Sequence, residues 1–600
     1  MTTESDPPRP EEQNQDQRSR ASEDDATPLG RLRRIVRNRS LERNRTRLVA
    51  IGRHSRLVLV LAALTGALTG LGVAGFDWVT RDELFAHLRH QPRWVEVAAP
   101  VLGLLGAAAL LRWLARTGSP ATADEYIRNF HEPGRRLDLR PVPGRILASI
   151  ATLGLGGAMG YEGPSIYLGA AIGSTLQRRL SRFFSRDDAK VLLVAGAAAG
   201  VAAIFKAPAT GLVFALEVPY QDDLARGMLL PAGIAAAVSY LVFVSFAGTT
   251  PLFAVKGTPP FDLRDLGGAA LLGVMCGVAA RLFALGLVRA KRAPVHYSPW
   301  ARALLAGAGL AGLAALSYAL FDRPLTLGAG YDNLQWAFDP RRAVALVMAL
   351  FVMRAAATLL TVGGGGAGGL FIPLVVEGAL LGRAVGGLFR TAATGSNFFP
   401  LVGVSALLGA GYRVPLAAVV FAAEASGRPG FIVPGLIAAM VSQLFMGNAS
   451  VSPYQVSSRA GHLERRFALP LSAALRTDVA TIPSDATLAE FFWNHALGLR
   501  EHAVAVVDGA RYLGVMRVEE LREVAQEEWG TVTVVEWMRT DFPTASPGWR
   551  LRDALTAMER ADVDLLPVLD GENFVGVVTT AEILKLDDIL GMASGEPEDT

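Results

Sequence analysis

The chain of 600 residues is 51% hydrophobic and only 19% charged, whereas charged residues make up about a quarter of a soluble domain. Its net charge of +3 averages an acidic tail, a basic arm and a nearly neutral body, and its single cysteine, Cys276, excludes an intramolecular disulfide. Eight stretches contain no Asp, Glu, Lys or Arg, and they predict membrane spans or, where shorter, buried helices: Leu57–Phe76, Ile146–Tyr161, Gly163–Gln177, Gly227–Val255, Ala303–Phe321, Ala355–Val376, Thr391–Tyr412 and Pro429–Ser458.

Residues 1–50 are predicted to form a largely disordered cytoplasmic arm, whose first 30 residues are too hydrophilic for a signal peptide. Eight arginines follow between Arg31 and Arg47, against one acidic residue, Glu42. Arginine clusters beside a membrane span stay on the cytoplasmic side. A nucleic-acid-binding arm is the alternative, and we expect no nucleic-acid partner.

The next region, residues 51–462, contains an internal repeat. GYEGP at Gly160–Pro164 aligns with GLFIP at Gly369–Pro373 at an offset of 209 residues. KAPATGLVFALE at Lys206–Glu217 aligns with RVPLAAVVFAAE at Arg413–Glu424 at an offset of 207. These matches predict an all-α membrane domain built from a duplicated unit.

Both copies contain a glycine-rich break, at Gly156–Pro164 and at Gly363–Pro373. Glycines allow sharp turns and proline is tolerated in a helix's first turn, so each break is predicted to lead into a helix N-terminus. The free N–H groups and the dipole of such a terminus attract anions, and repeat-built transporters place their sites where broken helices meet. We therefore expect anion contacts at Gly160, Gly163 and Ile372.

Glu162 is the only charged residue between Ile146 and Gln177. A carboxylate at the bilayer centre costs about 2.5–3.5 kcal/mol, and intramembrane ionisable groups are as a rule functional. An acid inside an anion site occupies that site when charged and vacates it when neutral. Glu162 is therefore predicted to be a gate, the alternative being a structural pair with a cation elsewhere.

After about residue 470 charged residues return and a second repeat appears, at an offset of 62. VAVVDG at Val504–Gly509 recurs as LPVLDG at 566–571, and each copy continues into a second strand-like segment. Amphipathic helices are expected at Thr487–His495 and Arg550–Arg560. The pattern predicts an α/β tandem over residues 475–590, with its first copy at 475–529 and its second at 531–590.

The GYEGP segment resembles the GREGP or GKEGP motif of the CLC chloride channel and transporter family, and GGLFIP at Gly368–Pro373 resembles its GxFxP signature. Tyr454 falls where that family has its pore tyrosine, and the C-terminal tandem resembles a CBS-domain pair. The resemblance covers the chain from about Arg56 onward. It implies a duplicated, inverted-repeat CLC fold that transports chloride and is not an enzyme.

The resemblance also implies roles for single residues. Glu162 would be the external gate, the backbone N–H of Phe371 would lie near the central anion, and Tyr454 would donate its hydroxyl to that anion. Because Tyr454 lies in a charge-free run, its phenol is expected to be buried. The alternative for Phe371 and Tyr454 is simple packing. Tyr161 stands where an Arg or Lys usually precedes the gate.

The family's first signature, GSGIP, is altered here to RTGSPAT at Arg116–Thr122. The alignment that fits best puts Ser119 at the anion-binding serine, whose hydroxyl favours chloride. A shift of one residue would bring Pro120 to that position, and proline there accompanies nitrate preference in relatives.

Proton-coupled members carry two successive acids where this chain has Glu217 followed by Val218, and valine cannot relay a proton. The sequence therefore favours passive, channel-like conduction. The alternative is a proton/chloride antiporter that uses Glu217, water or another internal route. Glu217 has a structural reading too, as a cap or pair, because its repeat mate Glu424 implies a role common to both halves.

In nucleotide-binding CBS pairs a Ser or Thr and an Asp follow the last strand. Thr579 and Glu582 take these places in the second copy, and Arg517 and Glu520 in the first. An adenine nucleotide is one hypothesis for this pair, and a structural pair that aids dimerisation is the other. No metal or required cofactor is expected.

The resemblance further implies a homodimer in the cell membrane, with both termini cytoplasmic and with chloride and lipid as partners. A nucleotide-sensing membrane protein is a more distant alternative. A sensor would have no need of Glu162 between two glycines.

Overall fold

The computed structural model describes residues 56–116, 119–132, 137–181, 184, 190–253, 261–292, 296–339, 342–388, 398–457, 469–583 and 585–586. The predicted N-terminal arm, residues 1–50, lies outside these ranges, as do Thr117 and Gly118 beside Ser119. The chain forms two compact units, residues 1–458 and 459–600, and each is described by itself.

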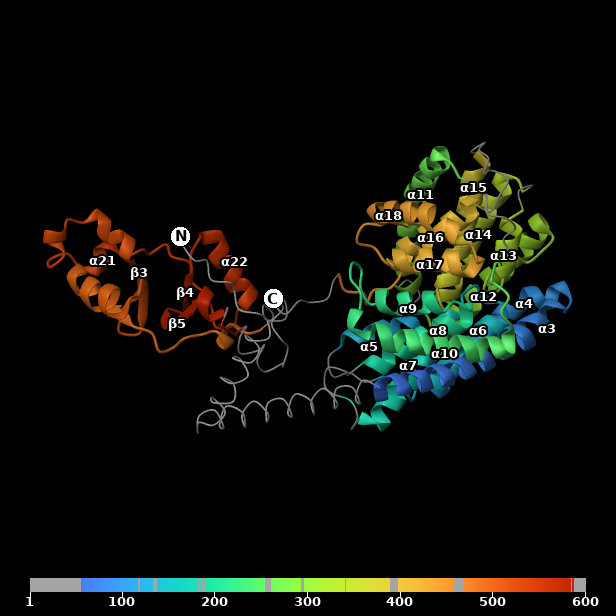
Figure 1. Ribbon diagram of the computed structural model, residues 1–600, viewed down its shortest axis with the longest axis horizontal. Helices are drawn as coiled ribbons and strands as arrows, with labels where there is room; N and C mark the ends of the chain where they lie inside the picture. Colours follow the sequence, from blue (N-terminus) through green and yellow to red (C-terminus); the bar gives the residue numbers. More distant parts are fainter. Residues whose placement is uncertain are drawn as a thin grey trace, which may run out of the picture. The chain divides into compact units, whose positions relative to one another are not determined.

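The first half of the membrane unit starts with a helix over Arg56–Arg89, which ends in the π-helical segment η1 (Trp78–Phe85) and α3 (Ala86–Arg89). The helices that follow are α4 (Arg93–Leu110), η2 (Leu111–Ala115), α5 (Ala123–His131), α6 (Val142–Gly154), α7 (Glu162–Arg179), α8 (Val191–Phe205), α9 (Pro208–Glu217) and α10 (Leu229–Ala247). Figure 1 shows the helices of this half in blue to green.

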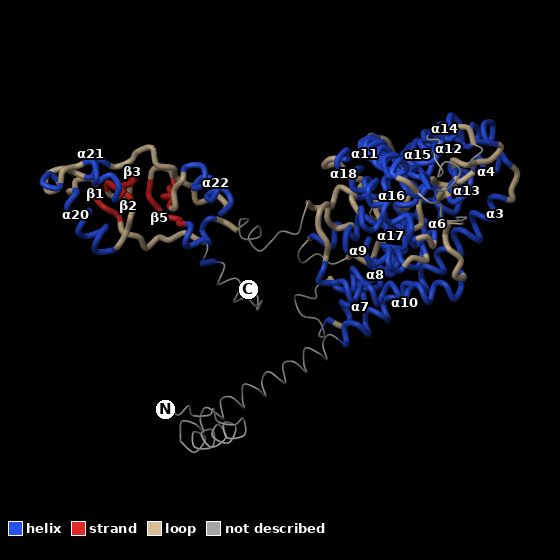
Figure 2. Tube along the Cα trace, turned by 45° about the horizontal axis from the view of Figure 1, so that its top comes forward, coloured by secondary structure: helices blue, strands red, loops and turns tan. Residues whose placement is uncertain are grey.

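The second half is also helical, and Figure 2 shows that the membrane unit as a whole consists of helices and loops. Its helices are α11 (Leu263–Arg292), α12 (Pro299–Phe321), α13 (Tyr331–Ala337), α14 (Val344–Gly363), α15 (Phe371–Leu388), α16 (Phe398–Tyr412), α17 (Pro415–Ser426) and α18 (Ile432–Met446).

Among the described residues, eight helices are long and apolar enough to cross a membrane. Their ranges are Arg56–Arg89, Arg93–Ala115, Arg226–Ala247, Leu263–Arg292, Pro299–Phe321, Val344–Gly363, Phe371–Leu388 and Pro429–Met446. Shorter charge-free runs form shorter helices. Every residue of α8 and α16 is buried, as expected for helices that are apolar on all sides.

The helices α7–α9 recur as α15–α17, which confirms the duplicated unit. Helix α7 packs on α8 as α15 packs on α16, and the short helices α9 and α17 pack on each other across the two halves. The sequence offsets of the repeat are thus offsets between equivalent helices.

Two carboxylates reveal that the halves run in opposite directions. Glu217, the last residue of α9, accepts hydrogen bonds from the N–H groups of Leu416 and Ala417 in the first turn of α17 (3.1 and 2.8 Å). Glu424, near the end of α17, accepts in return from Ala209 and Thr210 in the first turn of α9 (3.1 and 2.8 Å). Each helix can cap the other's N-terminus only if the two are antiparallel, as expected for an inverted repeat.

The described residues of the second unit form one sheet of five strands in the order β1-β2-β3-β5-β4. Its elements are β1 (Thr481–Pro483), α20 (Leu488–Glu490), the π-helical η8 (Phe491–Leu499), β2 (Ala503–Asp508), β3 (Arg511–Arg517), α21 (Val534–Trp537), α22 (Leu551–Ala561), β4 (Leu565–Asp570) and β5 (Asn573–Thr579). Helices thus begin within one residue of the two amphipathic segments predicted here.

The two antiparallel hairpins, β2–β3 and β4–β5, repeat each other in detail. Each turns through a glycine with positive φ, Gly509 at 62° and Gly571 at 65°, a conformation that costs little without a Cβ. Each also shifts register at the same place, between Val506 and Val507 and between Val568 and Leu569. The predicted α/β tandem is therefore present.

Candidate functional site

The two glycine-rich breaks meet directly. The N–H of Gly160 donates to the carbonyl of Gly369, and the N–H of Gly369 donates to the carbonyl of Gly160, both at 2.8 Å. Helices α7 and α15 begin next to this junction, at Glu162 and Phe371. The prediction that both halves contribute a helix N-terminus to one place is thus confirmed by the geometry.

The Glu162 carboxylate is lodged in this junction. Its side chain is fully buried, and its Oε1 accepts a hydrogen bond of 2.6 Å from the N–H of Phe371. The N–H of Ile372 also faces it. A Cβ built on Gly160 or Gly369 would overlap the carboxylate, so the two glycines make room for it.

The carboxylate thus occupies a place suited to an anion, at the positive end of α15. Its second oxygen, Oε2, is buried and has no hydrogen-bond partner in the described part of the chain. The structural alternative of a pair with a cation is not supported, because no ion pair of Glu162 is found among the described residues. An oxygen without a donor is a position where a proton can reside.

A cavity of about 340 Å³ opens beside the junction. Seventeen residues line it: Ser119, Pro120, Ala121, Thr122, Ala123, Asp124, Met159, Lys291, Arg302, Val362, Gly366, Gly368, Gly369, Leu370, Tyr412, Pro453 and Tyr454. They come from both halves of the unit. Gly369 and Leu370 belong to the loop that leads into Phe371, so the cavity reaches the peptide segment that binds Glu162.

Ser119 lines this cavity, as the alignment predicts. Its Oγ accepts from the N–H of Ala121 at 3.4 Å, while its carbonyl accepts from Arg145 Nε at 3.1 Å. Because the hydroxyl acts as an acceptor in the first contact, its proton is free to be donated into the cavity. Pro120 lines the same wall.

Charged groups gather at the cavity as well. Lys291 Nζ lies 3.1 Å from the carboxylate of Asp124, which also accepts from Ser452 Oγ at 2.8 Å. Arg302 donates from Nε to the carbonyl of Gly363 at 3.2 Å. Sequence reasoning missed these residues, because they lie in separate segments and carry no family signature.

Two tyrosines line the cavity, and only one was predicted. Tyr454 is 41% exposed and its ring lies 5.6 Å from the guanidinium of Arg128, so the expectation of a buried phenol is wrong. Its segment follows α18, and the absence of charge there indicated proximity to the membrane but not depth. Tyr412, at the end of α16, is buried and was missed.

The position predicted for an internal proton site is occupied by a structural pair. Glu217 caps α17 with both carboxylate oxygens, and Val218 is buried with its carbonyl bound to Gln455 Nε2 at 2.8 Å. The reading of Glu217 as a cap, shared with Glu424, is confirmed.

On another side of Glu162, two aromatic rings are stacked. The ring of Tyr161 lies 6.2 Å from that of Tyr331, with an angle of 10° between their planes. Tyr161 is buried and Tyr331 is partly buried, close to Asp77 and Arg81, which form an ion pair at 2.5 Å. Arg81 therefore supplies a positive charge close to the ring that replaces the family's Arg or Lys, although Asp77 neutralises it.

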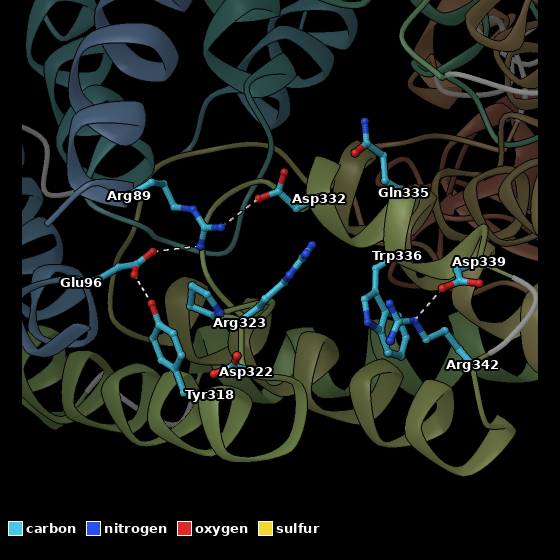
Figure 3. A pocket seen from close by; sticks show the side chains of 11 residues that line it. Arg89, Glu96, Tyr318, Asp322, Arg323, Asp332, Gln335, Trp336, Asp339 and Arg342 are labelled. Carbon is cyan, nitrogen blue, oxygen red and sulfur yellow. Dashed lines mark hydrogen bonds and ion pairs between the residues drawn. The ribbon is translucent and has the colours of Figure 1, made fainter. Parts of the chain in front are cut away.

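A second cavity, of about 450 Å³, lies near the far end of α12. Arg302 of the first cavity and Tyr318 of the second are 16 residues apart on α12, or roughly 24 Å at 1.5 Å per residue. Figure 3 shows Arg89 placed between Glu96 and Asp332, with Tyr318 pointing at Glu96 and Arg342 beside Asp339. Two of its three lining cations, Arg89 and Arg342, are paired with these carboxylates, and we assign this cavity no role.

The residues predicted for nucleotide binding lie after the strands of the second unit. Thr579 Oγ1 accepts from the N–H of Glu582 at 3.2 Å, and Glu582 pairs with Lys585 at 2.9 Å. Glu520 lies 4.0 Å from Arg539. Arg539 itself is held by Asp541 at 2.8 Å, and its hydrogen bonds lower the pKa of the Asp541 carboxyl.

Comparison with known proteins assigns the membrane unit to a protein family. Residues 102–447 match the family model described as voltage gated chloride channel, and residues 534–588 match the CBS domain. The chain is 30% identical over 412 residues to the H(+)/Cl(-) exchange transporter ClcA of Cronobacter sakazakii, covering 64% of this chain and 86% of the relative. It is 28% identical over 413 residues to the protein of the same name from Yersinia pestis, covering 65% and 85%.

Two solved structures share the fold. A slow cyanobacterial Cl-/H+ antiporter is similar with a TM-score of 0.57 and 23% identity, over 65% of this chain and 94% of that one. A eukaryotic CLC transporter is similar with a TM-score of 0.55 and 18% identity, over 88% of this chain and 97% of that one.

These findings define a multi-pass membrane protein that carries out CLC-type chloride transport. The chain belongs to the CLC, or voltage gated chloride channel, family, and a CBS domain lies in its C-terminal unit.

Proposed function

We propose that this chain exchanges chloride for protons, and that both ions use the site of Glu162. The observation that carries the proposal is the 2.6 Å hydrogen bond between the Phe371 N–H and the Glu162 carboxylate. A charged carboxylate there takes the place of an anion. Once protonated, it loses the charge that holds it at the helix terminus and leaves room for chloride.

The transport cycle then follows from this competition. Chloride enters the cavity lined by Ser119 and reaches the N–H groups of Phe371 and Ile372, near the glycines Gly160 and Gly163. Its arrival depends on the protonated side chain of Glu162 having moved away. When Glu162 releases its proton on one side and returns, chloride is expelled.

The exchange reading is supported by the relatives, which are named H(+)/Cl(-) exchange transporters. It needs an internal proton route that uses neither Val218 nor Glu217, since Glu217 is engaged as a helix cap. Asp124 is the acidic residue among those lining the cavity. We propose that water in the cavity carries protons between Asp124 and Glu162.

Passive conduction is the second candidate, and the observation that favours it is Val218. An apolar side chain offers no titratable group at that position. In this reading, Glu162 exchanges protons with one side only, so that pH opens the path without any proton crossing the membrane.

The experiment that separates the two is the chloride reversal potential of proteoliposomes at two imposed pH gradients. Exchange predicts that the reversal potential shifts with the pH gradient, that Asp124→Asn reduces the shift and that Glu162→Gln abolishes it. Asp222→Asn is the matched control, because Asp222 pairs with Arg413 at 2.9 Å and does not line the cavity. If the reversal potential of the unmodified protein does not change with the pH gradient, passive conduction is favoured.

We further propose a homodimer in the cell membrane, with both termini cytoplasmic. Mass measurement of the detergent-solubilised protein and protease accessibility in vesicles test these two points. An adenine-nucleotide site at Glu520, Thr579 and Glu582 stays a prediction. The structural role of the CBS pair is its alternative.

A further inference from the structure

A smaller cavity of the membrane unit, of about 230 Å³, is lined by three arginines. Arg112 belongs to the π-helical segment η2, Arg116 follows that segment, and Arg302 lies in the first turn of α12. The other lining residues are small or apolar: Ala108, Leu111, Pro299, Gly364 and Gly365. None of the described residues that line this cavity is acidic, so its charge is strongly positive.

The three guanidinium groups are available to a ligand. In the described part of the chain, neither Arg112 nor Arg116 forms an ion pair, and both side chains are exposed. Arg302 uses Nε to bind the carbonyl of Gly363 at 3.2 Å, which leaves its Nη1 and Nη2 without an acceptor among the described residues. The cavity near the far end of α12 differs in this respect, because four acidic residues accompany its three arginines.

The cavity lies where three of the candidate membrane spans end or begin. Arg93–Ala115 and Val344–Gly363 end beside it, and Pro299–Phe321 begins there. Trp113 and Trp300, each adjacent in sequence to a lining residue, pack with ring centroids 5.7 Å apart and are 67% and 37% exposed. Tryptophans are enriched where a membrane meets water. We therefore expect the cavity at the depth of the lipid headgroups.

The lining suits the phosphate of a lipid better than a free anion. Guanidinium groups bind phosphate oxygens through pairs of parallel N–H bonds, and basic pockets between transmembrane helices bind anionic headgroups. Ala108, Leu111 and Pro299 give the same cavity an apolar wall. The glycerol and upper acyl chain of a lipid would cover this wall, whereas free phosphate would leave it in contact with water.

The backbone that carries two of the arginines is unusual. The segment η2 is π-helical, and π-helical turns occur frequently at functional sites. Arg116 has a φ of 56°, in the left-handed region that side chains other than glycine rarely adopt. Residues held in such conformations are found at ligand-binding positions. The backbone is thus consistent with a site built for a ligand.

We propose that Arg112, Arg116 and Arg302 bind the phosphate of an anionic phospholipid, in the leaflet on the side of the cavity lined by Ser119. Arg302 lines both cavities, so the bound phosphate adds a negative charge at the margin of the anion path. Lipid binding at this place is independent of whether the chain exchanges chloride for protons or conducts it passively.

The test is native mass spectrometry of the purified full chain in detergent, titrated with dioleoyl phosphatidylglycerol and, separately, with phosphatidylcholine of the same acyl chains. Phosphatidylglycerol is expected to bind at least about tenfold more tightly, because choline neutralises the phosphate of the other lipid. The double variant Arg112→Gln/Arg116→Gln is expected to bind phosphatidylglycerol at least about tenfold more weakly than the unmodified protein.

The matched control is Arg178→Gln/Arg179→Gln, which removes the same charge. Arg178 and Arg179 are exposed in the last turn of α7 and do not line the cavity. This variant is expected to stay within about twofold of the unmodified protein. Equal binding of the two lipids by the unmodified protein, or equal losses in the two double variants, overturns the proposal.

Inorganic phosphate distinguishes a lipid headgroup from a free anion. At millimolar concentration it is expected to leave phosphatidylglycerol binding unchanged, and displacement of the lipid by phosphate overturns the assignment to a lipid.

A second measurement uses the unmodified protein and therefore does not depend on the folding of a variant. A phosphatidylglycerol analogue with a photoreactive diazirine close to its headgroup is reconstituted with the full chain in liposomes. Cross-links, located by mass spectrometry of the peptides, are expected in residues 111–116 and 299–302. Cross-links that avoid both segments overturn the proposal.

Discussion

Replacing Glu162 with glutamine removes the charge that competes with chloride and leaves the shape of the side chain. The bond from the Phe371 N–H is 2.6 Å long, shorter than an ordinary N–H···O bond, and charge-assisted hydrogen bonds are shorter than neutral ones. Bonds to charged groups contribute about 1.5–3 kcal/mol and neutral ones about 0.5–1.5 kcal/mol, so the variant loses about 1–1.5 kcal/mol of this contact. That loss lowers the ratio of the closed to the open arrangement roughly five- to tenfold.

The expected result is therefore chloride flux roughly five- to tenfold faster than in the unmodified protein, with little dependence on pH. Proteoliposomes loaded with chloride and assayed with a chloride electrode at several pH values provide the measurement. Glu424→Gln is the matched control, because Glu424 is also a carboxylate held by backbone N–H groups but lies at the α9–α17 contact. Flux and pH response equal to the unmodified protein in Glu162→Gln would refute the reasoning.

Three further predictions concern the caps, the selectivity and the soluble unit. Glu217→Ala and Glu424→Ala should each destabilise the fold by about 1–2 kcal/mol, because each removes two hydrogen bonds at a helix N-terminus. The measurement is the thermal midpoint of unfolding in detergent, which should fall. If Glu217→Ala instead loses the pH-gradient response at unchanged stability, Glu217 is a proton carrier. Ser119→Pro should shift anion preference from chloride towards nitrate, and an unchanged permeability ratio would place Ser119 outside the path. Calorimetry with AMP and ATP should give saturable heat that Glu582→Ala abolishes, and the absence of heat in the unmodified chain would assign the CBS pair a structural role.

Patterns within short stretches of the sequence were enough to predict the core of the site. Glu162 stood out because it is a lone charge in an apolar run, and Gly160 and Gly369 because they belong to two breaks in register. The duplicated unit likewise needed only two aligned segments, whereas its inversion was implied by the family resemblance. What these features share is that the evidence for each lies within a few residues of the sequence.

Residues brought together from distant segments could not be predicted in this way. Tyr412 ends the buried helix α16 and lines the same cavity as Leu370 only through the fold. Asp124 and Lys291 form their ion pair across two separate helices. For Glu217, the sequence allowed a proton site or a cap, and the contacts with Leu416 and Ala417 decide for the cap.

Tyr454 illustrates the opposite error. A charge-free run indicated a buried position, but such a run reports average composition and not the depth of one side chain. Past the end of α18 the chain turns towards Arg128, and the phenol is left half-exposed. The absence of charge in this run was read correctly, but the depth of the Tyr454 side chain could be determined only from the folded structure.

The central claim is that the Glu162 carboxylate and the transported anion compete for one site at the N-terminus of α15. Anomalous diffraction from bromide-soaked crystals tests it most directly, with the unmodified protein and Glu162→Gln compared at one pH above neutrality. The account predicts a bromide peak at the Phe371 N–H in Glu162→Gln and none there in the unmodified protein, where the carboxylate fills the position. Equal peaks in both proteins, or a Glu162→Gln structure with no anion at Phe371, would contradict it.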